Sequence, residues 1–313
     1  MIIYVMCATA RGARFVKCLF DLCPDDEFVV FSFRETPHEP PYLDQIAALA
    51  QERGATFIET RKVADPAHEG VWKTKPPDLL FLVSWRYLIP MSHGSRPRLG
   101  AVVFHDSLLP AYRGFSPTVW AILNGESQTG ATMFHLAEEV DSGDIIDQAP
   151  VPIGPDDTAA TVMGAVTDTY LELLRRNLPA LKRGEAPRRA QDHARATFTC
   201  RRLPGDNAID WSQPAKRIHD LIRGVTHPYP GAFTAFEEKR LTIWSASLPA
   251  KPQKYVGVVP GRVVALQPGV GATVLTGDGP LLLKTVQLEG EAEVDAADLL
   301  RSLSITLGAK PSG

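Results

Sequence analysis

Residues 1–33 read MIIYVMCATARGARFVKCLFDLCPDDEFVVFSF and alternate between two hydrophobic patterns. Residues 1–7 form a short continuous apolar run, which is typical of a strand buried on both faces of a parallel sheet. From Arg14 to Leu22 the apolar side chains recur at helical spacing, and 27–33 is again a short apolar run. A helix between two such strands predicts a crossover connection, and hence parallel strands in one sheet.

The alternation continues to residue 183 and predicts an α/β fold. The further strands expected are 55–59, 78–84, 100–104, 129–136 and 145–153, and the further helices are 42–53, 119–123 and 157–183.

Beyond residue 183 the pattern changes. Residues 184–208 are polar, basic and aperiodic, which is typical of a connector. The remaining elements expected are a helix at 213–224, short strands at 231–236, 240–246, 254–258, 261–266, 272–276 and 280–286, and a helix at about 295–305. Short strands at this spacing indicate a small β-barrel or sandwich. We therefore expect a domain over 1–190, a linker over 191–207 and a smaller domain over 208–313.

Composition favours two globular domains without a nucleic-acid-binding character. The 313 residues are 44% hydrophobic and 22% charged, and 33 Lys and Arg against 36 Asp and Glu give a net charge of −3. A nucleic-acid binder usually shows a basic excess, because contacts to phosphates supply much of its affinity. The four cysteines form no ligand cluster, so no metal is expected and the thiols read as reduced, with three of them packed near the first strand and helix. Without a membrane-spanning stretch, a cytoplasmic protein is expected.

The chemistry-bearing residues concentrate in 101–146, AVVFHDSLLPAYRGFSPTVWAILNGESQTGATMFHLAEEVDSGDII. His105 and Asp106 follow the predicted strand 100–104, and ligands bind at the carboxyl ends of strands in open parallel sheets. A histidine there can exchange protons near neutral pH. From position alone, His105 could equally be a residue that closes a turn, and Asp141, which precedes Ser-Gly, reads as a turn residue.

The stretch resembles the signature of the formyltransferases that use 10-formyltetrahydrofolate. The matching residues are His105, Ser107, Leu108, Leu109, Pro110, Tyr112, Arg113, Gly114, Pro117, Trp120, Gly125, Glu126, Thr129, Gly130, Thr132, Asp141 and Gly143. RRLPGDNAIDW (201–211) and RIHDLIRGVTHPYPGAF (217–233) are similar to the C-terminal domain of methionyl-tRNA formyltransferases and of the UDP-4-amino-4-deoxy-L-arabinose formyltransferase, the type that the chain resembles most. The resemblance implies a Rossmann-like formyltransferase domain with a mostly parallel sheet, followed by an OB-like β-barrel.

The resemblance also implies roles for individual residues. In that family a formyl group moves from N10 of the folate co-substrate to an amine, through a tetrahedral intermediate that carries an oxyanion. His105 would handle the protons and stabilise the oxyanion, and Asp141 would orient His105, support its charge or hold a water that relays protons. The wall of the pterin pocket would include Arg86, Tyr87, Leu88, Ile89, Glu138 and Glu139. Apart from the resemblance, Arg113, Ser107 and Asp106 are candidate contacts to the amine substrate. The fork of Arg113 suits an anionic group such as a phosphate, and a surface salt bridge is the alternative for this residue.

Position 103 departs from the family pattern. The catalytic asparagine of the family falls two residues before the histidine, and this chain has Val103 on the strand face that carries His105. Loss of one oxyanion donor typically costs about 10²- to 10³-fold in rate. Three explanations stay open: another donor (Asp106, Ser107, Ser84 or a water) replaces the asparagine, the chemistry differs, or the chain only binds a ligand.

The substrate that the sequence favours is a small amine, with a nucleotide-linked amino sugar as the leading candidate. Residues 34–46, RETPHEPPYLDQI, are acidic and proline-rich, unlike a basic loop that would enter a nucleic-acid groove. The connector carries Arg188, Arg189, Arg195, Arg201 and Arg202, which keeps methionyl-tRNA open as the alternative substrate. The sequence does not fix the oligomeric state, and a homodimer is one state that it permits.

Overall fold

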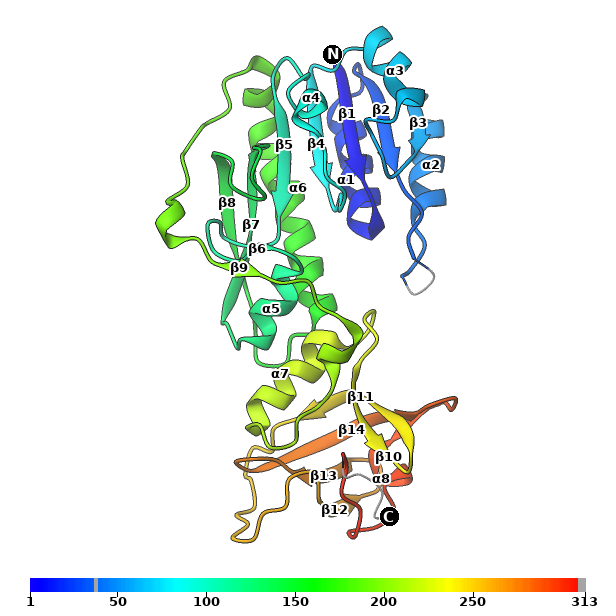
Figure 1. Ribbon diagram of the computed structural model, residues 1–313, viewed down its shortest axis with the longest axis vertical. Coiled ribbons are helices and arrows are strands. Elements are labelled where there is room, and N and C mark those ends of the chain that lie inside the picture. The colour runs from blue at the N-terminus through cyan, green and yellow to red at the C-terminus, as the bar shows by residue number, and fades with distance from the viewer. Residues whose placement is uncertain (37–38, 309–313) are drawn as a thin grey trace. The chain divides into compact units, whose positions relative to one another are not determined.

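The chain forms two compact units in the computed structural model, which describes residues 1–36 and 39–308. The first unit comprises Met1–Gly114, Thr129–Val151 and Gly164–Thr199, and the second comprises Phe115–Gln128, Pro152–Met163 and Cys200–Gly313 (Figure 1). Pro37 and His38, inside the acidic stretch 34–46, lie outside the described residues. No helix in the described part of the chain is both long and apolar enough to cross a bilayer.

The first unit is built on a seven-stranded sheet with the order β3-β2-β1-β4-β5-β7-β8. Its strands are β1 (Ile2–Cys7), β2 (Glu27–Ser32), β3 (Thr56–Glu59), β4 (Leu79–Val83), β5 (Ala101–His105), β7 (Gln128–His135) and β8 (Ile145–Pro152). The first five run parallel, and β7 pairs antiparallel with β5. The mostly parallel α/β sheet expected from the apolar runs is confirmed, because those runs are buried on both faces.

Helices cover both faces of this sheet. The helices are α1 (Thr9–Leu22), α2 (Leu43–Glu52), α3 (Glu69–Thr74), α4 (Met91–Gly94) and α6 (Ala159–Arg183), with a 3₁₀ turn η1 at Pro66–His68. On one face Phe104 of β5 packs against Phe15 of α1 and Tyr170 of α6. On the other face Trp72 of α3 packs against Tyr4 of β1. The short helices α3 and α4 were not expected from the sequence.

The connector expected after residue 183 is partly built into the first unit. Its β9 (Phe198–Thr199) pairs with β6 (Arg113–Gly114), and its Arg189 bridges to Ile145. We call residues 187–199, which include the 3₁₀ turn η2 at His193–Arg195, the strap. Polar side chains of the strap form hydrogen bonds with the core of the first unit. An aperiodic sequence gives no indication of such bonds. The domain boundaries at residues 190 and 208 stay a prediction.

The second unit contains helices α5 (Pro117–Leu123) and α7 (Ala215–Val225) and an antiparallel sheet. The strand order is β10-β11-β14-β13-β12, with β15 paired to β14. The strands are β10 (Ala232–Phe236), β11 (Lys239–Ser247), β12 (Val263–Gln267), β13 (Gly271–Leu275), β14 (Pro280–Leu288) and β15 (Glu293–Asp295). This confirms the expected β-rich C-terminal domain.

Two elements expected in the tail were wrong. Residues 254–258 form no strand, and Val256 is 97% exposed. The helix expected at 295–305 is only α8 (Ala296–Leu299), preceded by β15. The remaining short element is the 3₁₀ turn η3 at Pro204–Asn207. As expected, Cys7, Cys18 and Cys23 are buried near β1 and α1, whereas Cys200 is exposed, and all four are free.

Candidate active site

Strand β5 directs its last residues to opposite faces of the sheet. Val103 and His105 share one face with Ala101, which packs in the cluster around Trp72. Asp106 follows on the face where α1 and α6 lie, and contacts both helices. The end of β5 therefore serves two separate polar networks.

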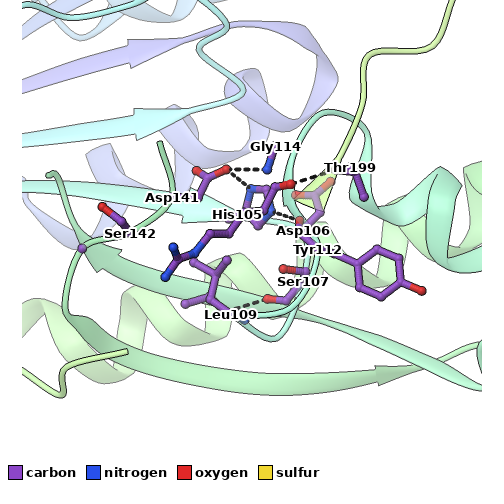
Figure 2. A network of polar contacts seen from close by, with 12 residues as sticks. His105, Asp106, Ser107, Leu109, Tyr112, Gly114, Asp141, Ser142 and Thr199 are labelled. Carbon is purple, nitrogen blue, oxygen red and sulfur yellow. Dashed lines mark hydrogen bonds and ion pairs between the residues drawn. The ribbon is translucent and has the colours of Figure 1, made fainter. Parts of the chain in front are cut away.

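His105 is buried between two hydrogen-bond acceptors. Its Nε2 lies 2.8 Å from the carbonyl oxygen of Tyr112, and its Nδ1 lies 3.5 Å from Oδ2 of Asp141 (Figure 2). A neutral imidazole has one N–H and can donate to only one of these acceptors, whereas an imidazolium donates to both. The setting suits a group that gains and loses a proton during a reaction.

The loop between β7 and β8 brings Asp141 to this position. Asp141 has φ +54°, a left-handed conformation that costs energy for a residue other than glycine. Its Oδ2 accepts the N–H of Gly114 at 2.8 Å (Figure 2). Gly143 allows the loop to return, since a Cβ there would lie 1.7 Å from the carbonyl oxygen of His135. The spacing of the Asp-x-Gly motif thus has a steric cause.

The glycine of the Tyr-Arg-Gly motif, Gly114, is also required for a steric reason. Its φ is +106°, and a Cβ there would lie 2.6 Å from the carbonyl oxygen of Thr199 in the strap. The absence of a side chain lets β6 and β9 pair closely, which points the Gly114 N–H at Asp141.

Asp106 belongs to the network on the opposite face. Its Oδ1 lies 2.7 Å from Nη1 of Arg11 and also accepts the hydroxyl of Tyr170. Burial opposes ionisation most strongly, but the Arg11 charge and the Tyr170 hydrogen bond hold the pKa of Asp106 below its ordinary value. Burial, together with the Asp106 charge, raises the pKa of Tyr170. Asp106 is therefore an ionised residue committed to a buried ion pair.

The other two residues expected to contact the amine substrate also have partners within the protein. Ser107 is 2% exposed and donates from Oγ to the carbonyl oxygen of Ala111 at 2.6 Å. Arg113 is 3% exposed, and its Nε and Nη2 donate to Oε1 of Gln191 at 3.2 and 2.6 Å. A substrate contact by either group stays a prediction, and would require these internal bonds to exchange.

The residues expected to wall a pterin pocket come from two loops that meet over one face of the sheet. Ile89 and Leu136 pack against one core cluster, and atoms of both lie near Gly94. The loop after β4 therefore meets the start of the loop that carries Glu138, Glu139 and Asp141. Glu138 and Glu139 are exposed, as is Leu88, which is 87% exposed.

Arg86 and Tyr87 complete this wall with contacts of their own. Arg86 forms an ion pair with Glu39 at 2.8 Å, and the Tyr87 ring packs against Phe33. The neighbouring Trp85 has a buried indole Nε1 without a hydrogen-bond partner among the described residues. A buried N–H left unsatisfied together with an exposed leucine fits an edge that receives an apolar ligand with polar atoms.

Val103 offers the site no hydrogen bond. Its half-buried side chain packs against two apolar clusters, one of which contains Leu109, Phe134 and Ile145. Of the replacement donors that the sequence suggested, Asp106 lies on the other face and the Ser107 hydroxyl bonds to Ala111. Ser84, at the end of β4 with φ +56°, and a water stay open, and His105 is itself a donor.

Sequence reasoning missed Arg11, Tyr170 and Gln191. Arg11 lies just beyond the carboxyl end of β1, so the rule for parallel sheets could have selected it. Tyr170 reads as one more apolar position of a long helix. Gln191 lies in an aperiodic segment and carries no signal in the sequence.

Comparisons with known proteins identify the family of the chain. Residues 29–178 match the model described as formyl transferase, and residues 204–304 match the model of the formyl transferase C-terminal domain. The chain belongs to the formyl transferase family. This confirms the expected family and the two-part architecture.

Solved structures at low identity share the fold. An N-formyltransferase from Helicobacter canadensis, crystallised with folinic acid and dTDP-3-aminofucose, is 15% identical with a TM-score of 0.67, covering 90% of this chain and 98% of that chain. A methionyl-tRNA formyltransferase from Clostridium thermocellum is 18% identical with a TM-score of 0.56, covering 80% and 94%. HypX from Aquifex aeolicus, in complex with tetrahydrofolic acid, is 18% identical with a TM-score of 0.62 and covers 96% of this chain. This chain spans about half of HypX, 46% of its length.

Proposed function

We propose that this formyl transferase moves a formyl group from 10-formyltetrahydrofolate to the amine of a small substrate, with a nucleotide-linked amino sugar as the leading acceptor. The observation that carries the proposal is the His105–Asp141 pair, 3.5 Å apart at the carboxyl edge of the sheet. The cytoplasmic location and the homodimer stay predictions.

The chemistry assigned to the pair is proton transfer. The folate, when bound, supplies a formyl carbon that is attached to N10. As the acceptor nitrogen bonds to that carbon, His105 removes a proton from the amine, and as the bond to N10 breaks, a proton returns to N10. Asp141 supports the imidazolium and holds its orientation, and the positive charge of the protonated His105 is proposed to stabilise the developing oxyanion.

The folate is proposed to bind where the loop after β4 meets the loop before β8. There Leu88 is exposed and offers apolar contact, and the buried Trp85 Nε1 is a donor without a partner in the described part of the chain. Arg86, Tyr87, Ile89, Glu138 and Glu139 stay in this proposal as pocket residues.

A small anionic acceptor is favoured over tRNA because arginines of the connector contact other side chains of the protein. Arg188 pairs with Asp144 at 3.8 Å, and Arg202 donates to Asn207 at 2.7 Å. Side chains engaged in this way are less available for phosphates of an acceptor stem. The structures compared include an N-formyltransferase crystallised with dTDP-3-aminofucose as well as a methionyl-tRNA formyltransferase, so tRNA remains the alternative acceptor.

The direct test combines binding and transfer. We expect 5-formyltetrahydrofolate to raise the melting temperature in a concentration-dependent way, because a ligand that binds only the folded state stabilises it. Formyl transfer is then measured from 10-formyltetrahydrofolate to UDP- and dTDP-amino sugars, and in parallel to methionyl-tRNA. Transfer to the tRNA alone would replace the sugar proposal, whereas folate binding without transfer would favour a ligand-binding protein.

His105→Ala tests the role of the pair. We expect kcat to fall by about 10²- to 10⁴-fold, the usual contribution of a positioned general acid-base group. The control is His68→Ala, since His68 lies in η1 and packs against Phe31 of β2, which β1 and β4 separate from β5. Transfer that survives in His105→Ala would exclude the proposed mechanism.

A further inference from the structure

Gln191 of the strap uses the full hydrogen-bonding capacity of its amide inside the protein. Its Oε1 accepts from Nε and Nη2 of Arg113, at 3.2 and 2.6 Å. Its Nε2 donates to the carbonyl oxygens of Asp141 and Gly143, at 2.9 and 2.7 Å. A guanidinium only donates and a carbonyl only accepts, so the orientation of the amide is fixed by its partners. The residue is 5% exposed.

These bonds close a ring that contains the catalytic pair. Arg113 lies between Tyr112, whose carbonyl accepts from His105, and Gly114, whose N–H donates to Asp141. Through its side chain Arg113 is bonded to Gln191, and Gln191 is bonded to the backbone of Asp141. The segment 112–114, which bonds to both His105 and Asp141, is thus joined to the loop that carries Asp141 by one buried amide.

The strap also holds the Arg113 side of this ring. Thr197 accepts the N–H of Arg113 at its carbonyl oxygen and the N–H of Tyr112 at its Oγ1, both at 2.8 Å. Asp141, in contrast, has a left-handed backbone at φ +54°, which persists only where surrounding contacts enforce it. The two bonds from Gln191 to Asp141 and Gly143 are contacts of this kind.

We propose that Gln191 is a positioning residue that sets the separation of His105 Nδ1 from Asp141 Oδ2, and so controls the rate of the transfer step. The kinetic part of this inference rests on the proposed function. A neutral amide suits the task, because it satisfies the buried Arg113 and the Asp141 loop without placing another charge beside the pair.

The test is Gln191→Glu, which keeps an acceptor for Arg113 but removes both N–H donors to the Asp141 loop. We expect kcat to fall by about 10- to 100-fold, with the KM of both substrates within about threefold, as for other residues that orient a catalytic group. Gln191→Asn, which is one methylene shorter, should show the same split. The matched control is Gln51→Glu on the exposed side of α2, which should retain the wild-type kcat.

A second readout does not depend on transfer activity. In ¹⁵N-glycine-labelled protein, hydrogen exchange at the Gly114 amide should become faster in Gln191→Glu and stay unchanged in Gln51→Glu. If the wild-type chain transferred no formyl group, the proposed function would fail while this readout still decided the positioning role. Unchanged Gly114 exchange would overturn the inference, as would an equal loss of kcat in both glutamates. Global unfolding of both Gln191 variants would also overturn it, since the residue would then support the whole unit.

Discussion

Two arginines with little solvent exposure lie near the end of β5, and they are balanced in different ways. Arg11 faces the carboxylate of Asp106 at 2.7 Å, on the side of α1 and α6. Arg113 faces the neutral amide of Gln191, on the side of the strap. One network therefore contains a full ion pair, whereas the other contains a cation bonded to an uncharged group.

We call Arg11, Asp106 and Tyr170 the rear network, which holds the end of β5. We call Arg113, Gln191 and Asp141 the front network, which positions the loops of the site. The ion pair joins β5 to α1, and the Tyr170 hydroxyl extends it to α6, so it fixes the scaffold behind His105. The amide network joins the loops in front, where Asp141 must keep its own negative charge for His105. An additional carboxylate there would compete for the histidine, which a glutamine does not.

Asp141→Asn breaks the front network and should have the largest effect. The amide loses the charge that supports the imidazolium, so kcat should fall by about 10²- to 10⁴-fold, measured in the formyl transfer assay with saturating substrates. Asp144→Asn, in the same loop but at a partly exposed position, is the matched control and should stay within about twofold. Activity of Asp141→Asn above a third of wild type would remove Asp141 from the mechanism.

Arg11→Met breaks the rear network and should act mainly on stability. It leaves the Asp106 carboxylate buried without its cation, so the free energy of unfolding at pH 7 should fall by about 3–5 kcal/mol in urea denaturation. Arg14→Met on the same helix removes a pair with side chains 47% and 61% exposed, and should cost below about 1 kcal/mol. Equal losses in the two variants would show that the Arg11 pair contributes no more than a surface one.

The pH dependence of Arg11→Met follows from the lowered pKa of Asp106. A carboxyl group with a lowered pKa stabilises the fold above its unfolded pKa of about 3.9, and this contribution is lost as the pH falls through the folded pKa. Without Arg11, burial raises the pKa of Asp106, and the variant takes up a proton at milder acidity. The stability difference between wild type and variant should therefore be smaller at pH 5 than at pH 7. A difference that grows on acidification would contradict the ion pair.

The sequence predicts the front and rear networks unequally, for physical reasons. Strands buried on both faces leave apolar runs, and the motif from His105 to Gly143 contains both members of the pair. Gln191 could not be predicted, because its partners lie 48 to 78 residues away in the chain and a polar connector has no periodicity. The strand expected at 254–258 fails for the opposite reason, since its apolar residues have the pattern of a strand but are exposed to solvent.

Val103 lies on β5, the strand whose end both networks contact. Of the substitutions considered, Val103→Asn should have the smallest effect. The side chain packs among apolar residues of two clusters, so an amide there should lower the free energy of unfolding by about 1–2 kcal/mol. If His105 or another donor already serves the oxyanion, kcat should change by less than about threefold. The measurements are urea denaturation and the formyl transfer assay, with Val102→Ala as a core control on the opposite face. A rise in kcat of tenfold or more would instead show that the site lacks a donor at position 103, since one preorganised donor is worth about 10²- to 10³-fold.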